Sequence, residues 1–207
     1  MSPRSALLFA LVLGVLAGCG VVQEGGAGAN SIVSSTPEDV AAESIQGRWW
    51  TWATSEGEST NPVTDMTGEF CGRNQPEDVW FLAGTFGGTL QRTCKVPGGR
   101  PVVFPLVNQV CAEAECTEFM ATAKGKATLD GKEITPERME DDNVTMTGVA
   151  GNPVTGEKGT ITSYACGLWV RLPPLKAGRH KLVIRGSSGD FRTGVDYTLI
   201  VGSGQQA

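Results

Sequence analysis

The sequence has a single histidine, His180, and it contains no Cys-x-x-Cys pair. Nucleophilic catalysis needs a base beside the nucleophile. His180 lies between Arg179 and Lys181, whose positive charge is expected to disfavour its protonation. We interpret it as a surface residue at the start of a strand and predict no histidine-based catalysis. Because cysteine pairs and histidines are also the usual ligands of structural zinc, no metal and no cofactor is predicted.

Long apolar runs are missing as well. A helix that crosses a bilayer takes about 20 apolar residues, and the run at residues 6–16 is too short for that. It follows the only cation of the segment, Arg4, and it ends in small residues. This layout is typical of a secretory signal.

The end of that run, Leu16, Ala17, Gly18 and Cys19, resembles the lipobox of bacterial lipoprotein signals. The resemblance implies that residues 1–18 are removed and that Cys19 carries acyl chains. Two or more acyl chains anchor a protein stably where one is marginal. We therefore expect a protein of the cell envelope that is attached to the extracytoplasmic side of a membrane through Cys19.

Positive charge is scarce. The chain has 17 basic and 22 acidic residues, and loss of Arg4 with the signal leaves a net charge of −6. Such a balance argues against a nucleic-acid partner and against binding to an anionic membrane through the protein's own surface. Residues 19–35 are rich in Gly, Ala and Ser and are interpreted as a flexible tether. Residues 36–203 are then one domain.

The cysteines other than Cys19 are odd in number, which in an oxidising compartment indicates two disulfides and one left-over thiol. They are Cys71, Cys94, Cys111, Cys116 and Cys166. Of the possible pairings we favour Cys71 with Cys94, which ties a loop to a strand, and Cys111 with Cys116, which staples the short turn CAEAEC. Cys166 is then the single thiol.

A helix is expected to open the domain. Thr36 can cap it, Pro37 suits the first helical position, and acidic residues follow in the first turn. Its apolar residues share one face at helical spacing: Ala41, Ile45, Trp49 and Trp52. Gly47 leaves an alternative open, in which the helix stops there and residues 48–52 form a strand with Trp50 and Trp52 on one face. The helix is favoured.

From residue 78 onward, short segments rich in β-branched and aromatic residues are separated by Gly/Pro turns. The strongest local pattern is KATLDGKEIT, in which Asp130 and Gly131 fit a two-residue hairpin turn. In VDYTLIV, apolar residues alternate as in a half-buried strand. The predicted fold is mainly β, an Ig-like or jelly-roll-type β-sandwich with one N-terminal helix.

Three blocks, VWFLAGTFGG, RTCKVPGGRPVVFPLVN and LWVRLPPLKAGRHKLVI with VDYTLIV, resemble segments of secreted bacterial proteins of unassigned function. The resemblance covers about residues 45–201. It implies an Ig-like sandwich edge in the last part and carries over no activity or site residue.

Two acidic runs are the remaining enzymatic candidates, since glycoside hydrolysis needs only two carboxylates across a cleft. They contain Glu113, Glu115 and Glu118, and Glu140, Asp141 and Asp142. The second run could also hold calcium. We interpret both as solvated acidic surface.

Most of the five tryptophans lie in apolar patterns and are interpreted as core, with Trp50 as a candidate exposed ligand platform. The favoured function is a non-enzymatic module of the envelope that binds a protein or an envelope polymer. The alternative is a secreted carbohydrate-binding module or a carbohydrate-active hydrolase that uses Trp50 and the acidic runs.

Overall fold

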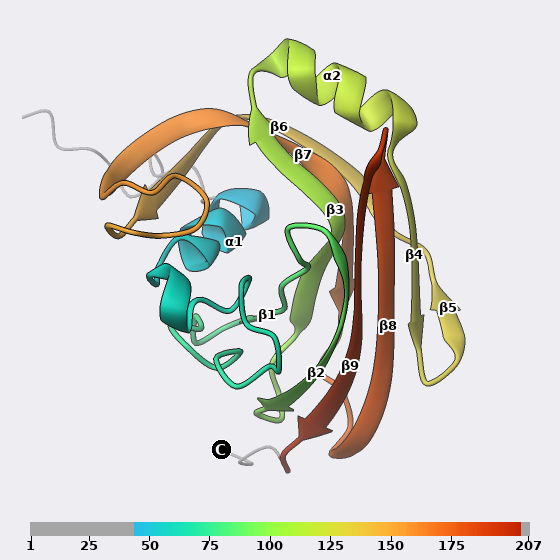
Figure 1. Ribbon diagram of the computed structural model, residues 1–207. Helices are drawn as coiled ribbons and strands as arrows, with labels where there is room; N and C mark the ends of the chain where they lie inside the picture. The colour runs from blue at the N-terminus through green and yellow to red at the C-terminus, as the bar shows by residue number, and fades with distance from the viewer. Residues whose placement is uncertain (1–43, 204–207) are drawn as a thin grey trace, which may run out of the picture. The chain divides into compact units, whose positions relative to one another are not determined.

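The computed structural model of the chain describes residues 44–203, which all belong to one compact unit (Figure 1). This part of the chain contains two α-helices, one short 3-10 helix and nine strands. In chain order they are α1 (Ile45–Ala53), η1 (Glu58–Thr60), β1 (Trp80–Phe81), β2 (Gly88–Val96), β3 (Val102–Cys111), α2 (Glu113–Thr122), β4 (Lys124–Leu129), β5 (Lys132–Ile134), β6 (Glu137–Gly148), β7 (Gly159–Leu172), β8 (Gly178–Ser188) and β9 (Phe191–Val201).

The strands form two sheets. One has the order β1-β3-β7-β6, and the other has the order β2-β9-β8-β4-β5. The pairs β1–β3 and β2–β9 are parallel, and the other pairs are antiparallel. The prediction of a mainly β fold is confirmed. The prediction of a single helix is wrong, because α2 is a second one.

An apolar core joins the two sheets. Buried residues of β3 and β7 pack in one cluster with buried residues of β2, β4, β8 and β9. The alternation expected in the last strand is present, since Val195, Tyr197, Leu199 and Val201 all belong to this core. The two sheets therefore share an apolar core.

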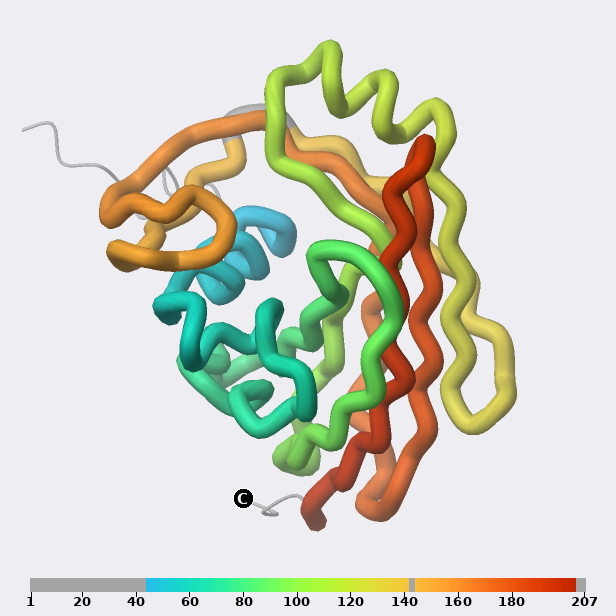
Figure 2. The backbone as a smooth tube through the Cα atoms, viewed as in Figure 1, coloured from blue at the N-terminus to red at the C-terminus, as the bar shows by residue number. Residues whose placement is uncertain are grey.

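The other face of the β1-β3-β7-β6 sheet is covered by α1. Trp49, Trp50 and Trp52 of this helix pack in a second cluster with residues of β3, β6 and β7. Figures 1 and 2 show β7 bending past α1. Because both faces are covered, the residues of β3 from Val102 to Val107 are all buried, without the alternation of a half-exposed strand.

The helix α1 runs through Gly47 instead of ending there, so the alternative of a strand at residues 48–52 is wrong. Its cap is Ser44, whose hydroxyl oxygen accepts a hydrogen bond from the Gly47 N–H at 3.0 Å. A Cβ at Gly47 would lie 3.1 Å from the carbonyl oxygen of Thr145, so glycine lets the helix approach β6 closely. The predicted continuous helix from a cap at Thr36 to Trp52 is wrong, because Ser44 is a non-helical cap and α1 begins at Ile45; Thr36 itself lies outside the described residues.

The predicted hairpin at Asp130 and Gly131 is confirmed and joins β4 to β5. Both residues have positive φ, 50° and 81°, as a turn of this type requires. No helix within residues 44–203 is long and apolar enough to cross a membrane.

The segment expected to be a stapled turn is helical. Residues Glu113–Thr122 form α2, with Glu113 and Glu115 in its first turn. Only Cys116 and Met120 of this helix are buried, and they pack with Cys166 of β7 in a small third cluster. The run Ala-Glu-Ala-Glu is rich in good helix formers, and acidic residues suit a helix N-terminus.

Candidate ligand-binding pocket

A pocket lies between α1, the loop that follows β1, the middle of β3 and the start of β9. Most of its lining is aromatic or apolar, including Trp49, Trp50, Phe86, Val154 and Phe191, and Asn108 adds an amide. The cavity measures about 60 Å³. That is less than half of the roughly 150 Å³ of a cavity that takes up benzene, so the space fits one small group.

Trp50 lines this pocket, but it is only 6% exposed, so the prediction of an exposed platform is wrong. The reason is that α1 is covered on two sides, by the sheet and by the loops that follow the helix. The Trp50 ring packs edge-on against Trp49, with 4.9 Å between the ring centroids.

The indole N–H of Trp50 differs from those of its neighbours. Trp49 donates to the carbonyl of Leu82 at 3.0 Å, and Trp52 donates to the carbonyl of Arg73 at 2.8 Å. The Trp50 Nε1 atom is shielded from solvent and has no hydrogen-bond partner among the described residues. The Asn108 side-chain nitrogen, which belongs to the same pocket, is in the same state.

Two exposed phenylalanines belong to the lining. Phe86 is 56% exposed and Phe191 is 38% exposed, although both are large apolar side chains. Between them in the lining, the hydroxyls of Thr85 and Thr193 are 3.1 Å apart. The pocket thus has an apolar outer part and unpartnered donors in its wall.

The loop of the pocket that carries Phe86 is held by a buried cation. The Arg92 guanidinium, on β2, donates at 3.1 and 2.9 Å to the carbonyls of Ala83 and Gly84. Tyr197 of β9 donates to the same Ala83 carbonyl at 2.9 Å, and burial raises the pKa of this tyrosine. The same Arg92 nitrogen lies within hydrogen-bond distance of the Tyr197 hydroxyl, and the other two nitrogens donate to the carbonyls of Val63 and Asp65.

Sequence reasoning missed Arg92, although a signal is present. In the strand segment LQRTCKV, Arg92 has the same parity as Cys94 and Val96, and all three side chains point inward and are buried. Period-2 alternation places residues i, i+2 and i+4 of a strand on one face. An arginine in phase with apolar residues therefore indicates a buried cation.

The acidic candidates do not form a facing pair. Glu113, Glu115 and Glu118 are exposed along α2. In the second run, Glu140 pairs with Arg138 at 2.6 Å, and the Asp141 carboxylate accepts from the Gln46 amide at 2.7 Å. The side chain of Asp142 lies outside the described residues. The partners of Glu140 and Asp141 give both carboxylates a structural role.

His180 is paired on both sides of its ring. Nδ1 lies 2.7 Å from an Asp130 carboxylate oxygen, and Nε2 lies 2.9 Å from the carbonyl oxygen of Lys176. The hydrogen bond to Asp130 raises the pKa of His180. The expectation that its neighbours disfavour protonation is wrong, because this carboxylate across the β4–β5 turn outweighs Arg179 and Lys181.

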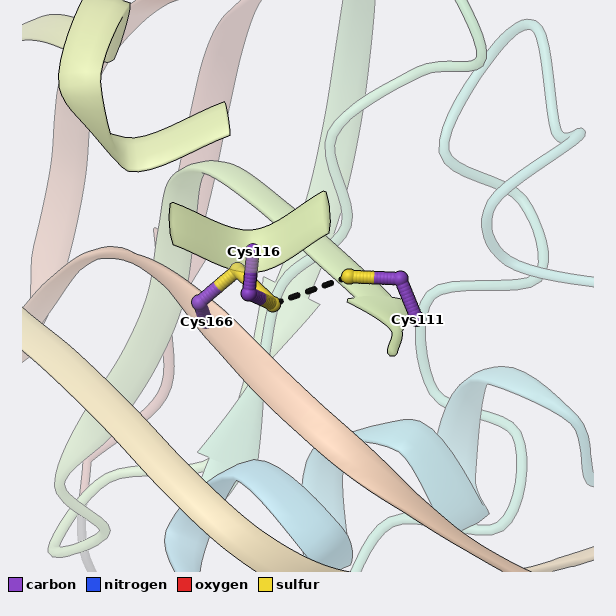
Figure 3. A group of neighbouring side chains, drawn as sticks. All are labelled: Cys111, Cys116 and Cys166. Atoms are coloured by element: carbon purple, nitrogen blue, oxygen red, sulfur yellow. Dashed lines mark hydrogen bonds between the residues drawn. A yellow bond between two sulfur atoms is a disulfide. The ribbon is translucent and has the colours of Figure 1, made fainter. Parts of the chain in front are cut away.

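One of the two disulfides is the predicted one, and the other is not. Cys71 is bonded to Cys94, as expected. The predicted bond between Cys111 and Cys116 is wrong, because Cys116 is bonded to Cys166, and Cys111 is the free thiol. The inner side of α2 brings Cys116 onto β7, as Figure 3 shows, so a partner 50 residues away is bonded in place of one five residues away.

Comparisons of the chain with protein-family models, with curated proteins and with solved structures found no match.

Proposed function

We propose that this protein is a lipid-anchored, extracytoplasmic module of the bacterial cell envelope that catalyses no reaction and binds a segment of another protein. The anchor rests on the lipobox-like residues Leu16–Cys19 and the Gly-rich tether that follows them. The binding role rests on the pocket beside α1.

The observation that carries the proposal is the pair of unpartnered donors. A donor buried without a partner costs roughly 1–3 kcal/mol. Trp50 and Asn108 both contribute such a nitrogen, and both line the same pocket. Both nitrogens are shielded from solvent, so a ligand carbonyl reaches them only when the lining side chains shift, and by accepting from either nitrogen it then removes part of this cost. An extended polypeptide supplies one carbonyl per residue together with apolar side chains.

The size and lining of the cavity favour a peptide over a sugar ring. About 60 Å³ accommodates the end of one aliphatic side chain. A pyranose ring is larger than benzene, which takes a cavity of about 150 Å³. The exposed rings of Phe86 and Phe191 suit a protein interface, where aromatic side chains supply much of the binding energy.

We also propose that the two sheets form a β-sandwich of Ig-like or jelly-roll type. The apolar core shared by the sheets supports this. In this scheme α1 adds a layer on the outside of one sheet, and the pocket lies between this layer and the sheet.

Selection from a random peptide library tests the binding role. We expect enriched peptides with an apolar residue, and we expect Phe86→Ala and Val154→Phe each to weaken their binding about tenfold. Phe86→Ala removes an aromatic contact, and Val154→Phe fills the cavity. Met66→Ala is the matched control, because Met66 is an exposed apolar residue outside the pocket lining. Equal binding by all variants contradicts the proposal.

Incorporation of radiolabelled palmitate in the native host tests the anchor. Labelling that disappears in Cys19→Ala is the expected result. An unlabelled protein, or labelling that persists in Cys19→Ala, contradicts the anchor without affecting the binding proposal.

The alternative is a carbohydrate-binding module or carbohydrate-active hydrolase, for which aromatic residues such as Trp50 and Phe86 in the lining would supply the stacking surface. A glycan array combined with hydrolase assays separates the two. Glycan binding that is lost in Val154→Phe, or turnover that is lost in Glu140→Gln or Asp141→Asn, replaces the peptide proposal with this one.

A further inference from the structure

Three sulfur atoms meet where β3, α2 and β7 come together (Figure 3). Cys116 and Cys166 form a disulfide, and the Cys111 thiol sulfur lies 2.9 Å from the Cys116 sulfur. All three sulfurs lie within 4.8 Å of one another. Since a disulfide sulfur is not a thiolate ligand, this state of the cluster suits sulfur exchange better than metal binding.

The three cysteines differ in access. Cys116 and Cys166 are fully buried, whereas Cys111, the last residue of β3, is half-buried. The accessible thiol of the cluster is therefore the one that is not in the disulfide. Any thiol or disulfide from outside the protein meets the cluster at Cys111.

We propose that the three cysteines form a thiol–disulfide exchange site in which Cys111 attacks Cys116. The Cys111 thiol loses its proton, and the thiolate forms a bond to the Cys116 sulfur as the Cys116–Cys166 bond breaks. The electron pair of the broken bond leaves with Cys166, which takes up the proton. One disulfide and one thiol are present before and after the step, so no oxidant or reductant is consumed.

The exchange changes the covalent bond that attaches α2 to the rest of the protein. Before it, the helix is tied covalently to β7, 50 residues away in the sequence. After it, the disulfide joins Cys116 to Cys111, which is the last residue of β3 and lies two residues before the start of α2. The inner side of α2 then retains Met120 as its buried anchor, together with contacts of its C-terminal half such as the hydrogen bond from Ser188 to the Phe119 carbonyl at 2.6 Å.

The rate of the exchange depends on how much Cys111 is ionised, because the thiolate is the nucleophile. Burial, followed by the negative charge of Glu115, raises the pKa of Cys111. The other charged or titratable side chains around the cluster are Glu113 on α2, Arg138 and Glu140 on β6 and Tyr164 on β7. Below the pKa, the thiolate fraction and hence the exchange rate rise about tenfold per pH unit.

The direct test uses the wild-type full chain without reductant. The protein is incubated at pH 7 or at pH 8, quenched in acidic denaturant, alkylated with a maleimide, digested with pepsin and mapped without reduction. We expect a peptide in which Cys111 is bonded to Cys116, together with alkylated Cys166, and its rate of appearance should rise about tenfold between the two pH values. Alkylation at Cys111 alone at both pH values, with Cys166 always bonded, overturns the proposal.

Two variants give an independent test of the same site. In Cys166→Ser, treatment with oxidised glutathione is expected to bond Cys111 to Cys116 and to leave neither residue open to alkylation. In Cys111→Ser, the matched control, Cys116 is expected to stay bonded to Cys166 at both pH values. A near-UV circular dichroism spectrum like that of wild type shows that each variant is folded. A folded Cys166→Ser protein in which Cys111 and Cys116 both remain alkylatable contradicts the proposal.

Discussion

The two faces of the β1-β3-β7-β6 sheet differ in where their buried, unpartnered donors lie. Against the second sheet, the buried polar side chains Arg92 and Tyr197 have hydrogen-bond partners, and the indole nitrogen of Trp80, which has none, lies in the shared apolar core outside the pocket. On the side of α1, Trp50 and Asn108 each leave a buried nitrogen without one. Donors that are bonded within the core serve stability, whereas unpartnered donors on residues that line a pocket are candidates for a ligand. We therefore expect substitutions in the shared core to reduce stability and substitutions in the pocket beside α1 to reduce binding.

The largest effect is expected at Arg92. Arg92→Met removes the donors to the carbonyls of four residues in the loops beside the sheet and leaves those carbonyls buried. We expect the free energy of unfolding to fall by about 3 kcal/mol or more, measured by urea denaturation. Lys95→Met, at an exposed position of the same strand, should change it little. A similar loss of unfolding free energy in both variants would mean that the Arg92 hydrogen bonds do not hold these loops in place.

The next effect concerns the disulfide of the shared core. Cys71 and Cys94 are 23 residues apart, and the loop-closure model assigns a bridge of that size about 3 kcal/mol. Replacing both cysteines by alanine should lower the melting temperature by several degrees, as measured by calorimetry. A melting temperature that does not change would show that the packing around the bridge, and not the bridge itself, fixes this region.

Tryptophan substitutions on the α1 side sharpen the comparison. Trp52→Phe removes a hydrogen bond to the Arg73 carbonyl and should cost about 1–2 kcal/mol of unfolding free energy. Trp50→Phe removes a donor that has no partner and should cost about 1 kcal/mol less. Urea titrations of the two variants measure the difference. Equal costs would show that the Trp50 donor is used within the fold.

The smallest effect is a pH-dependent one at the β4–β5 turn. The folded-state pKa of His180 is raised above 6.5 and that of Asp130 is lowered below 3.8. The stability that the pair supplies is therefore largest between about pH 4 and 6.5. It is lost as the pH rises through the folded-state pKa of His180, and also as the pH falls through that of Asp130.

Asp130→Asn tests this, because asparagine keeps the turn conformation and the oxygen that accepts from the Lys181 N–H. We expect the free energy of unfolding of wild type to exceed that of the variant by about 0.5 kcal/mol at pH 5.5, since the pair lies at the surface, and by less at pH 9. A difference that grows with pH would contradict the assigned pairing.

Local sequence patterns are sufficient to predict much of the core that the two sheets share. The hairpin at Asp130 follows from turn chemistry, and the alternation in β9 follows from the period of a strand. Cys71 and Cys94 flank a single apolar segment, so their disulfide could also be predicted from the sequence. In each case the decisive contact is close in sequence or repeats with a fixed period.

The α1 side and the α2 cluster depend on contacts that no local pattern contains. Trp50 is buried because the sheet covers α1 on one side and the loops that follow the helix cover it on another. Cys116 meets Cys166 only once α2 lies on β7, 50 residues later in the sequence. Helix α2 itself is predictable from the sequence, because Glu113 and Glu115, which we interpreted as solvated surface, also stabilise a helix N-terminus.

The most direct test of the account is the affinity of Trp50→Phe for a peptide selected on the wild-type protein, measured by isothermal titration beside its urea stability. The account predicts that binding weakens about tenfold, because the ligand loses the indole donor, while the fold loses little stability. Unchanged affinity together with a loss of stability as large as that of Trp52→Phe would contradict it, and would assign Trp50 to the core alone.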